Sequence, residues 1–248
     1  MDTEDATKNK FLHDMMRNEV EIQKNAIHKN IARLYTNFTF KDNDNKTYHG
    51  SVFDLYNEGD LRRMMNSEKE IAESTALRLI RGILEGLEYI HSEDQRVIHY
   101  DLKPENILLH KGTPAISDFG LSCKIPLGSV SLENPVQKGT FHYLPPEATD
   151  LSCKITTKID IWASGVILFE LLYSDRPFFR EPEFHDPKAY FNKLKASTVF
   201  DLNLSFPTSR LVSESTKMLL VNLLHPEATK RFSAADALDW LKEHDSTH

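Results

Sequence analysis

The stretch His99-Tyr100-Asp101-Leu102-Lys103-Pro104-Glu105-Asn106-Ile107-Leu108-Leu109 decides the fold, and Asp118-Phe119-Gly120 follows it closely. The first stretch brings an Asp, a Lys and an Asn together on one short loop, and the second adds another Asp. Carboxylate and amide oxygens are the ligands that Mg²⁺ takes in proteins. A lysine beside them offers a positive charge to a phosphate. Together, in this order and at this spacing, the two motifs indicate phosphoryl-transfer chemistry.

Each polar residue of these motifs has its own expected role. Asp101 is the candidate catalytic base that aligns a substrate hydroxyl, and Lys103 screens the charge of the transferred phosphate. Asn106 and Asp118 are the expected Mg²⁺ ligands. The alternative is a polar loop whose Asp and Asn residues only cap turns. Chemically distinct residues in register favour the functional interpretation, whereas His99 is expected to be structural.

These motifs resemble the signature of the eukaryotic protein kinases, His-Arg-Asp-x-x-x-x-Asn followed by Asp-Phe-Gly. Gly139 to Glu147 stands where that family's activation segment ends in Ala-Pro-Glu, and Asp160 to Gly165 matches the helix that anchors the catalytic loop. Arg231 stands where the family pairs an Arg with the Glu of that segment. Lys103 and Thr140 are the choices of serine/threonine kinases. The resemblance implies ATP and Mg²⁺ as cofactors and a protein Ser or Thr as substrate.

Within that family the chain is similar to the tousled-like kinases. The segments that carry this likeness are Ile98 to Pro104, Gly139 to Glu147, Lys154 to Pro177 and Ser205 to Pro207. The resemblance to kinases as a whole covers roughly Asn18 to Trp240.

Tyr100 stands where most members of the family carry Arg. That Arg pairs with a phosphorylated activation loop through charge-assisted hydrogen bonds, which Tyr cannot form as an ion pair. The sequence therefore predicts that switching by loop phosphorylation is weak or absent.

The resemblance also implies a site for adenine. Phe53 falls at the gatekeeper position, and Asp54 to Tyr56 fall at the hinge, whose backbone groups would bond the purine edge. Asp60 falls where an acidic residue meets the ribose, and Leu108 would form the floor under the base. The alternative is a strand end followed by an Asp that caps a helix. The main motifs favour the nucleotide site.

The expected fold is α+β: protein-kinase-like, with a truncated small lobe, a helix plus β-hairpin, on a mainly helical large lobe. Residues 1–248 would form one domain, with 1–56 as the remnant of the small lobe and hinge and 57–248 as the large lobe. Apolar periodicity predicts a helix from Phe11 to Ile27 and strands at Asn30 to Phe40 and Ser51 to Tyr56.

Helix signals mark the rest of the chain. Ser67 and Glu70 form a Ser-x-x-Glu capping box, which predicts a helix through Ile90. Gly82 and Gly86 on this helix are expected to permit close packing. Further helices are predicted at Ile159–Tyr173, Lys188–Lys195, Ser213–Leu224 and Ser233–Glu243, with Ser213 and Ser233 as N-caps.

Two kinase features are missing from this sequence. The first glycine is Gly50, so there is no Gly-x-Gly-x-x-Gly loop, and no strand Lys precedes Glu19 to pair with it. Lys8 and Lys10 lie upstream but are expected to be solvated. The resemblance then implies that the first strands of the small lobe are absent. The apolar surface that they would cover is expected to recruit a protein partner or to promote aggregation.

Composition excludes several classes. A net charge of −7 argues against nucleic acid as the main ligand. The start of the chain is acidic with no apolar signal region, and the longest apolar run, Ile161 to Leu172, is too short to span a bilayer, so no membrane segment is expected. Only two cysteines occur, which favours a reducing intracellular compartment, nucleus or cytoplasm.

Three functions remain open from the sequence. The first is a serine/threonine protein kinase, in an incomplete version of the domain. The second is a catalytically impaired kinase-like binding module, which the missing glycine loop and lysine favour. A small-molecule kinase is the third, and it is disfavoured because Gly139 to Glu147 resembles a platform for peptide substrates.

Overall fold

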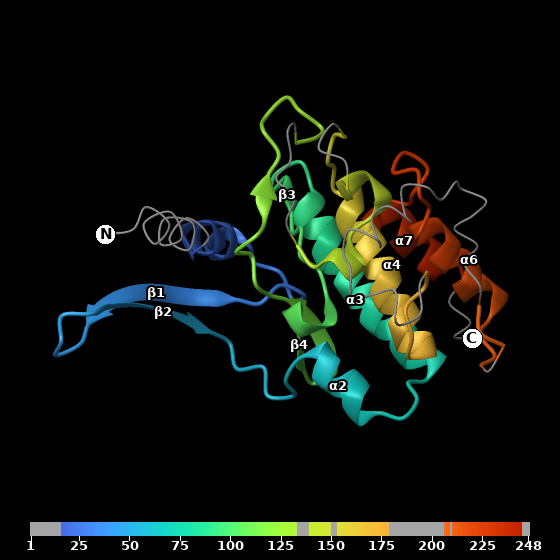
Figure 1. The fold of residues 1–248 in the computed structure, drawn as a ribbon, viewed down its shortest axis with the longest axis horizontal. Coiled ribbons are helices and arrows are strands. Elements are labelled where there is room, and N and C mark those ends of the chain that lie inside the picture. The colour runs from blue at the N-terminus through green and yellow to red at the C-terminus, as the bar shows by residue number, and fades with distance from the viewer. Residues whose placement is uncertain (1–15, 133–138, 150–152, 179–205, 209, 245–248) are drawn as a thin grey trace.

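The computed structural model describes residues 16–132, 139–149, 153–178, 206–208 and 210–244, in which a helix and a two-stranded ribbon project from a mainly helical body (Figure 1). Besides the helix at 16–25, the helices are α2 (Leu61–Ser67), α3 (Glu73–His91), α4 (Lys158–Tyr173), α6 (Glu214–Leu223) and α7 (Ala234–Glu243). The strands are β1 (Leu34–Lys41), β2 (Thr47–Phe53), β3 (Val97–Ile98), β4 (Ile107–His110), β5 (Thr113–Ile116) and β6 (Cys123–Lys124). Short 3₁₀ turns are η1 (Pro104–Asn106), η2 (Phe141–Tyr143) and η3 (Pro146–Thr149). The predicted α+β class, with few strands beside a helical lobe, is confirmed.

The predicted hairpin is present as β1 and β2, with shifted bounds. The two strands pair antiparallel, from Leu34 opposite Phe53 to Lys41 opposite Thr47. The second strand begins four residues before its predicted start, because the turn is tight. The Asp42 carboxylate accepts hydrogen bonds from the backbone N–H groups of Asp44 and Lys46, at 3.0 and 2.9 Å, and closes the turn directly after β1.

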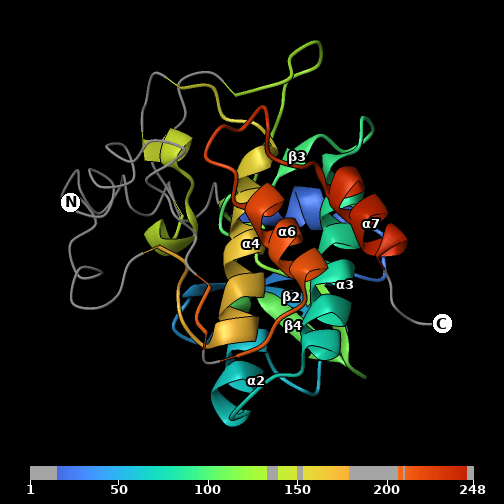
Figure 2. The same cartoon turned by 90° about the vertical axis from the view of Figure 1, so that its right-hand side faces the viewer.

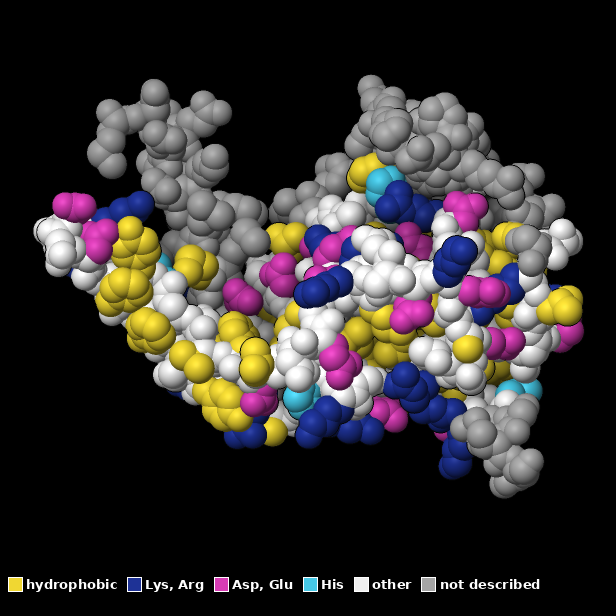
Figure 3. Space-filling view, turned by 90° about the horizontal axis from the view of Figure 1, so that it is seen from below, with side chains coloured by type: hydrophobic (Ala, Val, Ile, Leu, Met, Phe, Trp, Pro, Cys, Tyr) yellow, Lys and Arg dark blue, Asp and Glu magenta, His cyan; other side chains and the backbone are white. Residues whose placement is uncertain are grey.

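One face of the ribbon carries exposed aromatic rings, as the sequence predicted. Phe40 stacks on Tyr48 across the strands, with ring centroids 5.2 Å apart, and Phe38 lies 6.0 Å from Phe40. About half of the surface of Phe38 and of Phe40 is exposed. Figure 3 shows hydrophobic side chains along the projecting ribbon. We name Phe38, Phe40, Tyr48 and Val52 the aromatic face; these residues lie on the same side of the pleat.

The helix at 16–25 ends two residues before its predicted end at Ile27. The backbone N–H of Ile27 donates to the Tyr89 hydroxyl at 3.1 Å, and the Ile27 side chain turns out into solvent. His28 then stacks on the Tyr89 ring, with centroids 5.1 Å apart. These contacts with α3 tie the chain to the body before it enters β1. The predicted start of this helix, Phe11, lies outside the described residues.

The body is built around α3 and α4, with α6 and α7 packed over them (Figure 2). The middle helix, α4, is buried at every position from Ile159 to Leu172, which explains why it reads as a continuous apolar run. In contrast, α3 buries one face only, against α4, α7 and β5. The two glycines of α3 permit the close packing that was predicted. A Cβ on Gly86 would lie 2.8 Å from the carbonyl oxygen of Asn30, and one on Gly82 would lie 2.6 Å from the Pro114 ring.

The capping box predicted at Ser67 is wrong. Ser67 is the last residue of α2, where its hydroxyl donates to the Met64 carbonyl at 2.9 Å. The side chain of Glu70 faces Arg210 at 3.4 Å instead of reaching back to Ser67. The next helix, α3, begins only at Glu73, without a side-chain cap. The Ser-x-x-Glu spacing therefore marked the end of a short helix rather than the start of a long one.

The other two predicted caps are confirmed. Ser213 accepts a hydrogen bond from the backbone N–H of Thr216 at the start of α6. Ser233 forms a complete capping box with Asp236 at the start of α7. The predicted helix Lys188–Lys195 and the two upstream lysines, Lys8 and Lys10, lie outside the described residues. Among the helices that the structure describes, none is both long and apolar enough to cross a membrane.

Candidate active site

Asp160, at the start of α4, holds the loop that carries the decisive motif. Its carboxylate accepts the backbone N–H of His99 at 2.8 Å and that of Tyr100 at 2.9 Å, and it contacts His91 Nε2 at 2.8 Å. These bonds fix Tyr100 with a φ of 73°, a left-handed conformation that is costly for a bulky residue. The His99 ring is buried, lies 2.9 Å from the Ser117 carbonyl and packs on Phe119. The buried carboxylate of Asp160 thus holds the loop in place.

Three polar residues bond to Asp101. Lys103 Nζ donates to Asp101 Oδ2 at 2.7 Å. Thr140 donates to Oδ1 through both its hydroxyl, at 2.7 Å, and its backbone N–H, at 2.8 Å. The Asn106 amide donates to the Asp101 carbonyl at 2.9 Å. Lys103 Nζ also lies 3.0 Å from the Thr140 hydroxyl, so the cluster is closed.

Asn106 and Asp118 lie at the same end of the β4–β5 pair. The register places Ile107 opposite Ile116, so the residues that flank these strands are neighbours. The Asn106 carbonyl accepts both the N–H and the hydroxyl of Ser117, at 2.8 and 3.0 Å. Asp118 itself has a φ of 61°, which turns the chain sharply into the Phe119-Gly120 segment.

This donor set suits Mg²⁺. Asn106 uses its amide nitrogen on Asp101, which leaves its amide oxygen as the group that can face a cation. Asp118 adds a carboxylate. No cluster of three or more His, Cys, Asp or Glu side chains that could cage a metal occurs among the described residues. Mg²⁺ is typically bound by one or two protein oxygens together with substrate phosphates and water, so two ligands are what such a site requires.

The helix at 16–25 rests on the Asp118-Phe119-Gly120 segment. The Asn18 amide donates to the carbonyls of Phe119 and Ser122, at 3.2 and 2.8 Å. Glu19, one residue on, is partly buried, and burial together with the nearby charge of Asp118 raises its pKa. Among the described residues, no Lys, Arg or His forms an ion pair with Glu19 or Asp118.

The three residues expected at the hinge lie at the base of the ribbon. Phe53 ends β2 and is half-buried, whereas Asp54 is exposed and accepts a hydrogen bond from the Tyr35 hydroxyl at 2.8 Å. The Asp54 backbone N–H donates to the Arg33 carbonyl, and the Tyr56 hydroxyl accepts the Arg33 N–H, both at 3.2 Å. Thus Asp54 and Tyr56 bond to the segment that enters β1.

Asp60 and Leu108 are brought together by a bridge between their backbones. The Asp60 carboxylate accepts the Arg63 N–H at 2.8 Å and so caps α2, which is the structural alternative that the sequence left open. Among the described residues, no hydrogen bond joins Asp60 or Leu108 to Phe53, Asp54 or Tyr56. The structure thus places Asp60 beside Leu108, and Asp54 and Tyr56 beside Arg33.

Two interactions that matter here were not identified as site features from the sequence. Thr140 contacts Asp101 directly, although it stood in a recognised motif. Arg62 joins Glu105 at 2.9 Å, Tyr143 at 2.7 Å and Glu170 at 2.9 Å. The partners of Arg62 are between 43 and 108 residues away, so no local pattern could have indicated this junction.

Arg231 and Glu147 form the ion pair that the resemblance implied. Two hydrogen bonds join them, from Nη1 to Oε1 at 2.7 Å and from Nη2 to Oε2 at 3.1 Å. The Arg231 side chain is fully buried and also donates to the carbonyls of His225 and Lys158. This pair fixes the end of the segment that begins at Thr140 to the helical body.

The fold is that of a protein kinase domain. The family model "Protein kinase domain" matches residues 1–241, and the chain belongs to this family. Its members generally use ATP and Mg²⁺.

Curated relatives are kinases in organisms as different as plants, yeasts and mammals. The serine/threonine-protein kinase TOUSLED of Arabidopsis thaliana is 36% identical over 64% of this chain and 24% of its own length. An Aurora kinase of Yarrowia lipolytica is 34% identical over 89% of this chain and 54% of its own length. The human serine/threonine-protein kinase tousled-like 1 is 31% identical over 91% of this chain and 30% of its own length. The chain therefore spans between about a quarter and a half of the length of these relatives.

Proposed function

We propose that this chain is a serine/threonine protein kinase that transfers the γ-phosphate of ATP to a protein hydroxyl. The observation that carries the proposal is the closed cluster in which Lys103, Thr140 and Asn106 all bond to Asp101. A residue that only capped a turn would not need a lysine, a threonine and an amide around one carboxylate. Membership of the protein kinase domain family supports the same conclusion.

In the proposed reaction, Asp101 aligns the substrate hydroxyl and accepts its proton as the oxygen attacks the γ-phosphorus. The bond from that phosphorus to the bridging oxygen breaks, and ADP leaves. Lys103 balances negative charge on the phosphoryl oxygens, since its ammonium already lies 2.7 Å from the carboxylate that meets the hydroxyl. Asn106 and Asp118 would hold Mg²⁺, which neutralises the β- and γ-phosphates when it is bound.

For adenine we propose the residues that the resemblance indicates. Phe53 would limit the back of the site, backbone groups from Asp54 to Tyr56 would bond the purine edge, and Leu108 would form its floor. Asp60 would meet the ribose with the carboxylate oxygen that does not cap α2. The bridge between Asp60 and Leu108 supports a common site for ribose and base.

Residues 1–248 are proposed to form one kinase-like domain of the tousled-like subfamily, acting in the nucleus or cytoplasm. Similarity to TOUSLED and to human tousled-like 1 supports the subfamily, although the Aurora relatives are equally similar in identity. The substrate would be a protein Ser or Thr, because Lys103 and Thr140 are the residues that the resemblance to serine/threonine kinases implies.

Phosphorylation of the activation segment is proposed to have little effect on activity. Tyr100 is buried, and burial raises its pKa to about 12, so it stays a neutral phenol. It packs in an apolar cluster with Ile98, Ile125, Leu144, Ala148, Ile155 and Ile159. Tyr100 therefore cannot form an ion pair with a phosphate on the activation segment. If replacing every hydroxyl between Ser122 and Thr140, Thr140 excepted, abolished activity and phosphomimics restored it, this proposal would be wrong.

A second candidate function is that of a kinase-like module that binds a protein and transfers nothing. The aromatic face and the Glu19–Asp118 pair favour it, because both lack a covering or neutralising group within the described residues. A protein partner at the ribbon would supply what is missing.

Transfer of labelled phosphate from Mg-ATP to a generic protein substrate tests the two functions. The kinase proposal expects transfer by the wild-type chain, a loss of about a hundredfold or more in Asp101→Asn, and no loss in the control Asp94→Asn, whose side chain is exposed. A thermal shift with Mg-ATP should accompany transfer. A folded wild-type chain with neither shift nor transfer would overturn the kinase proposal and leave the binding module.

A further inference from the structure

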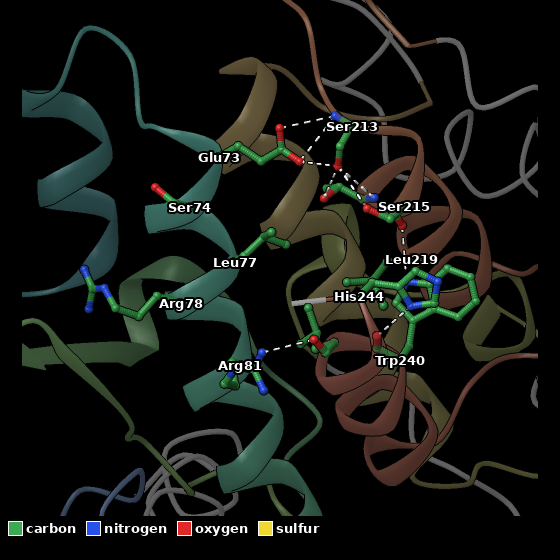
Figure 4. Close-up of a pocket in the computed structure, with 12 residues that line it drawn as sticks. Glu73, Ser74, Leu77, Arg78, Arg81, Ser213, Ser215, Leu219, Trp240 and His244 are labelled. Atoms are coloured by element: carbon green, nitrogen blue, oxygen red, sulfur yellow. Dashed lines mark hydrogen bonds between the residues drawn. The ribbon is translucent and has the colours of Figure 1, made fainter. Parts of the chain in front are cut away.

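A cavity lined by no residue of the Asp101 cluster lies between α3, α6 and α7. Its volume is about 640 Å³, which falls within the range of about 300–1,000 Å³ of small-molecule sites. Figure 4 shows it between one face of α3 and the paired helices α6 and α7. These two helices form the end of the body opposite to the ribbon (Figure 1). The cavity is thus separate from the proposed nucleotide site.

The middle of this cavity is apolar and has one flat wall. Leu77 from α3 and Trp240 from α7, both partly exposed, form its wall, with the buried Leu219 of α6 behind them. The indole is held by its N–H, which donates to the Ser215 carbonyl at 3.2 Å. It stacks on His244 with centroids 4.0 Å apart and planes within 17° of parallel. A flat ring can extend such a stack, because offset-stacked rings attract one another beyond the area they bury.

Opposite charges stand at the two ends of the cavity. Glu73 and Arg81 lie eight residues apart on the same helix, a rise of about 12 Å. Ser213 already binds the Glu73 carboxylate through its hydroxyl at 2.6 Å and its N–H at 3.2 Å. Arg81 donates to the Leu241 carbonyl at 3.2 Å, which holds its guanidinium at the other end. A guanidinium has five N–H donors in a planar fork, so it can serve an incoming carboxylate as well as that carbonyl.

We propose that this cavity binds a flat, apolar monocarboxylate, with its rings against Leu77 and Trp240 and its carboxylate on Arg81. The distance from Leu77 to Arg81 along α3 is a rise of about 6 Å, which fits one aromatic ring between the apolar contact and the acid group. Glu73 at the far end repels a second anionic group, so the ligand carries one. This site is independent of the kinase proposal.

Calorimetry and Trp240 fluorescence on the full chain test the site with matched probes. The probes are biphenyl-4-carboxylate and its neutral isostere biphenyl-4-carboxamide. The carboxylate is expected to bind roughly tenfold more tightly than the amide, the gain of a charge-assisted hydrogen bond. Arg81→Gln should remove this difference between the probes. Leu77→Trp should place a bulky indole where the rings of the probe would lie and abolish binding of both.

Arg78→Gln is the control variant. Arg78 also borders the cavity, but its guanidinium points away from Leu77 (Figure 4) and donates to the Gly112 carbonyl. Its replacement should leave both affinities unchanged. Three results would overturn the proposal: equal affinity for acid and amide, an effect of Arg78→Gln as large as that of Arg81→Gln, or calorimetric binding that persists in Leu77→Trp. Circular dichroism confirms that each variant is folded before it is compared.

Discussion

Thr140 donates two hydrogen bonds to the carboxylate of Asp101, one from its backbone N–H and one from its hydroxyl. The backbone bond would survive any substitution that keeps the loop in place, whereas the hydroxyl bond depends on the side chain. Lys103 contacts both residues. The geometry of the loop carboxylate therefore depends on a residue that lies 39 positions further along the chain.

Replacement of Thr140 tests this relationship. Thr140→Val keeps the shape of the side chain but removes the hydroxyl, so Asp101 and Lys103 each lose a partner. The rate of phosphate transfer should fall about tenfold or more, since an unmade hydrogen bond at a charged group costs about 1–3 kcal/mol. Thr140→Ser keeps the hydroxyl and should retain most of the activity. Equal rates in Val and Ser variants would show that the hydroxyl has no part in catalysis.

The buried pair of Arg231 and Glu147 should dominate the stability of the segment that ends there. Arg231→Met leaves the Glu147 carboxylate without its ion partner, and the free energy of unfolding in urea should fall by about 3–5 kcal/mol. The double replacement with Glu147→Leu should recover much of this loss. As a control, Lys29→Met breaks a pair with Glu85 in which the lysine is 65% exposed, at a cost of less than about 1 kcal/mol. Similar losses in both single variants would contradict the argument from burial.

Replacing Ser233, which caps a helix, should destabilise the protein more than replacing Ser67, which does not. Ser233→Ala removes the cap of α7 and should lower the free energy of unfolding by about 1 kcal/mol. Ser67→Ala, at the end of α2, removes only a bond to the Met64 carbonyl and should cost less. Urea unfolding of both variants tests this, and a larger loss at Ser67 than at Ser233 would contradict it.

Asp236 should make the stability of α7 depend on pH in acid. Hydrogen bonds from the Ser233 hydroxyl and N–H hold the pKa of its carboxyl below the ordinary 3.8. A lowered pKa means that the folded state favours the ionised form. The contribution is therefore complete above the ordinary pKa and is lost as the pH falls through the lower, folded-state pKa. Asp236→Asn should be less stable than wild type at neutral pH, with the difference vanishing in acid. Asp239→Asn, which removes an exposed carboxylate from the same helix, is the matched control.

The aromatic face should make the chain self-associate. Phe40→Ser removes an exposed ring that stacks on Tyr48, so light scattering at high concentration and binding of a hydrophobic dye should both fall. Stability should change little, because the ring is half exposed. Thr39→Ser, on the opposite face of the same strand, is the control. Unchanged scattering in Phe40→Ser would mean that self-association does not occur through the aromatic face.

Local patterns predicted much of this fold. The spacing of apolar residues predicted α4, the hairpin and α7, because buried positions recur at a fixed interval along a helix or a strand. Ser233 was a reliable cap because its partner Asp236 lies three residues away. Ser67 failed because the same spacing also occurs by chance at a helix end, and only the contact of Glu70 with Arg210 reveals it.

The candidate site was likewise predictable only where its residues lie close together in the sequence. Asp101, Lys103 and Asn106 lie on one loop, so their grouping followed from the sequence, and the structure brings them into contact. The cavity beside Trp240 could not be predicted, because it exists only where three separate helices meet. The junction at Arg62 was missed for the same reason.

The hydrogen bonds of Glu170 couple three segments of the protein during thermal unfolding. This nearly buried carboxylate accepts hydrogen bonds from Arg62 on α2, Tyr143 in η2 and Arg176 beyond the end of α4. If one donor were released, the remaining two would have to compensate a buried anion alone, which is costly. Loosening of one of these segments therefore weakens the others, and the region should give a single calorimetric peak rather than a stepwise transition.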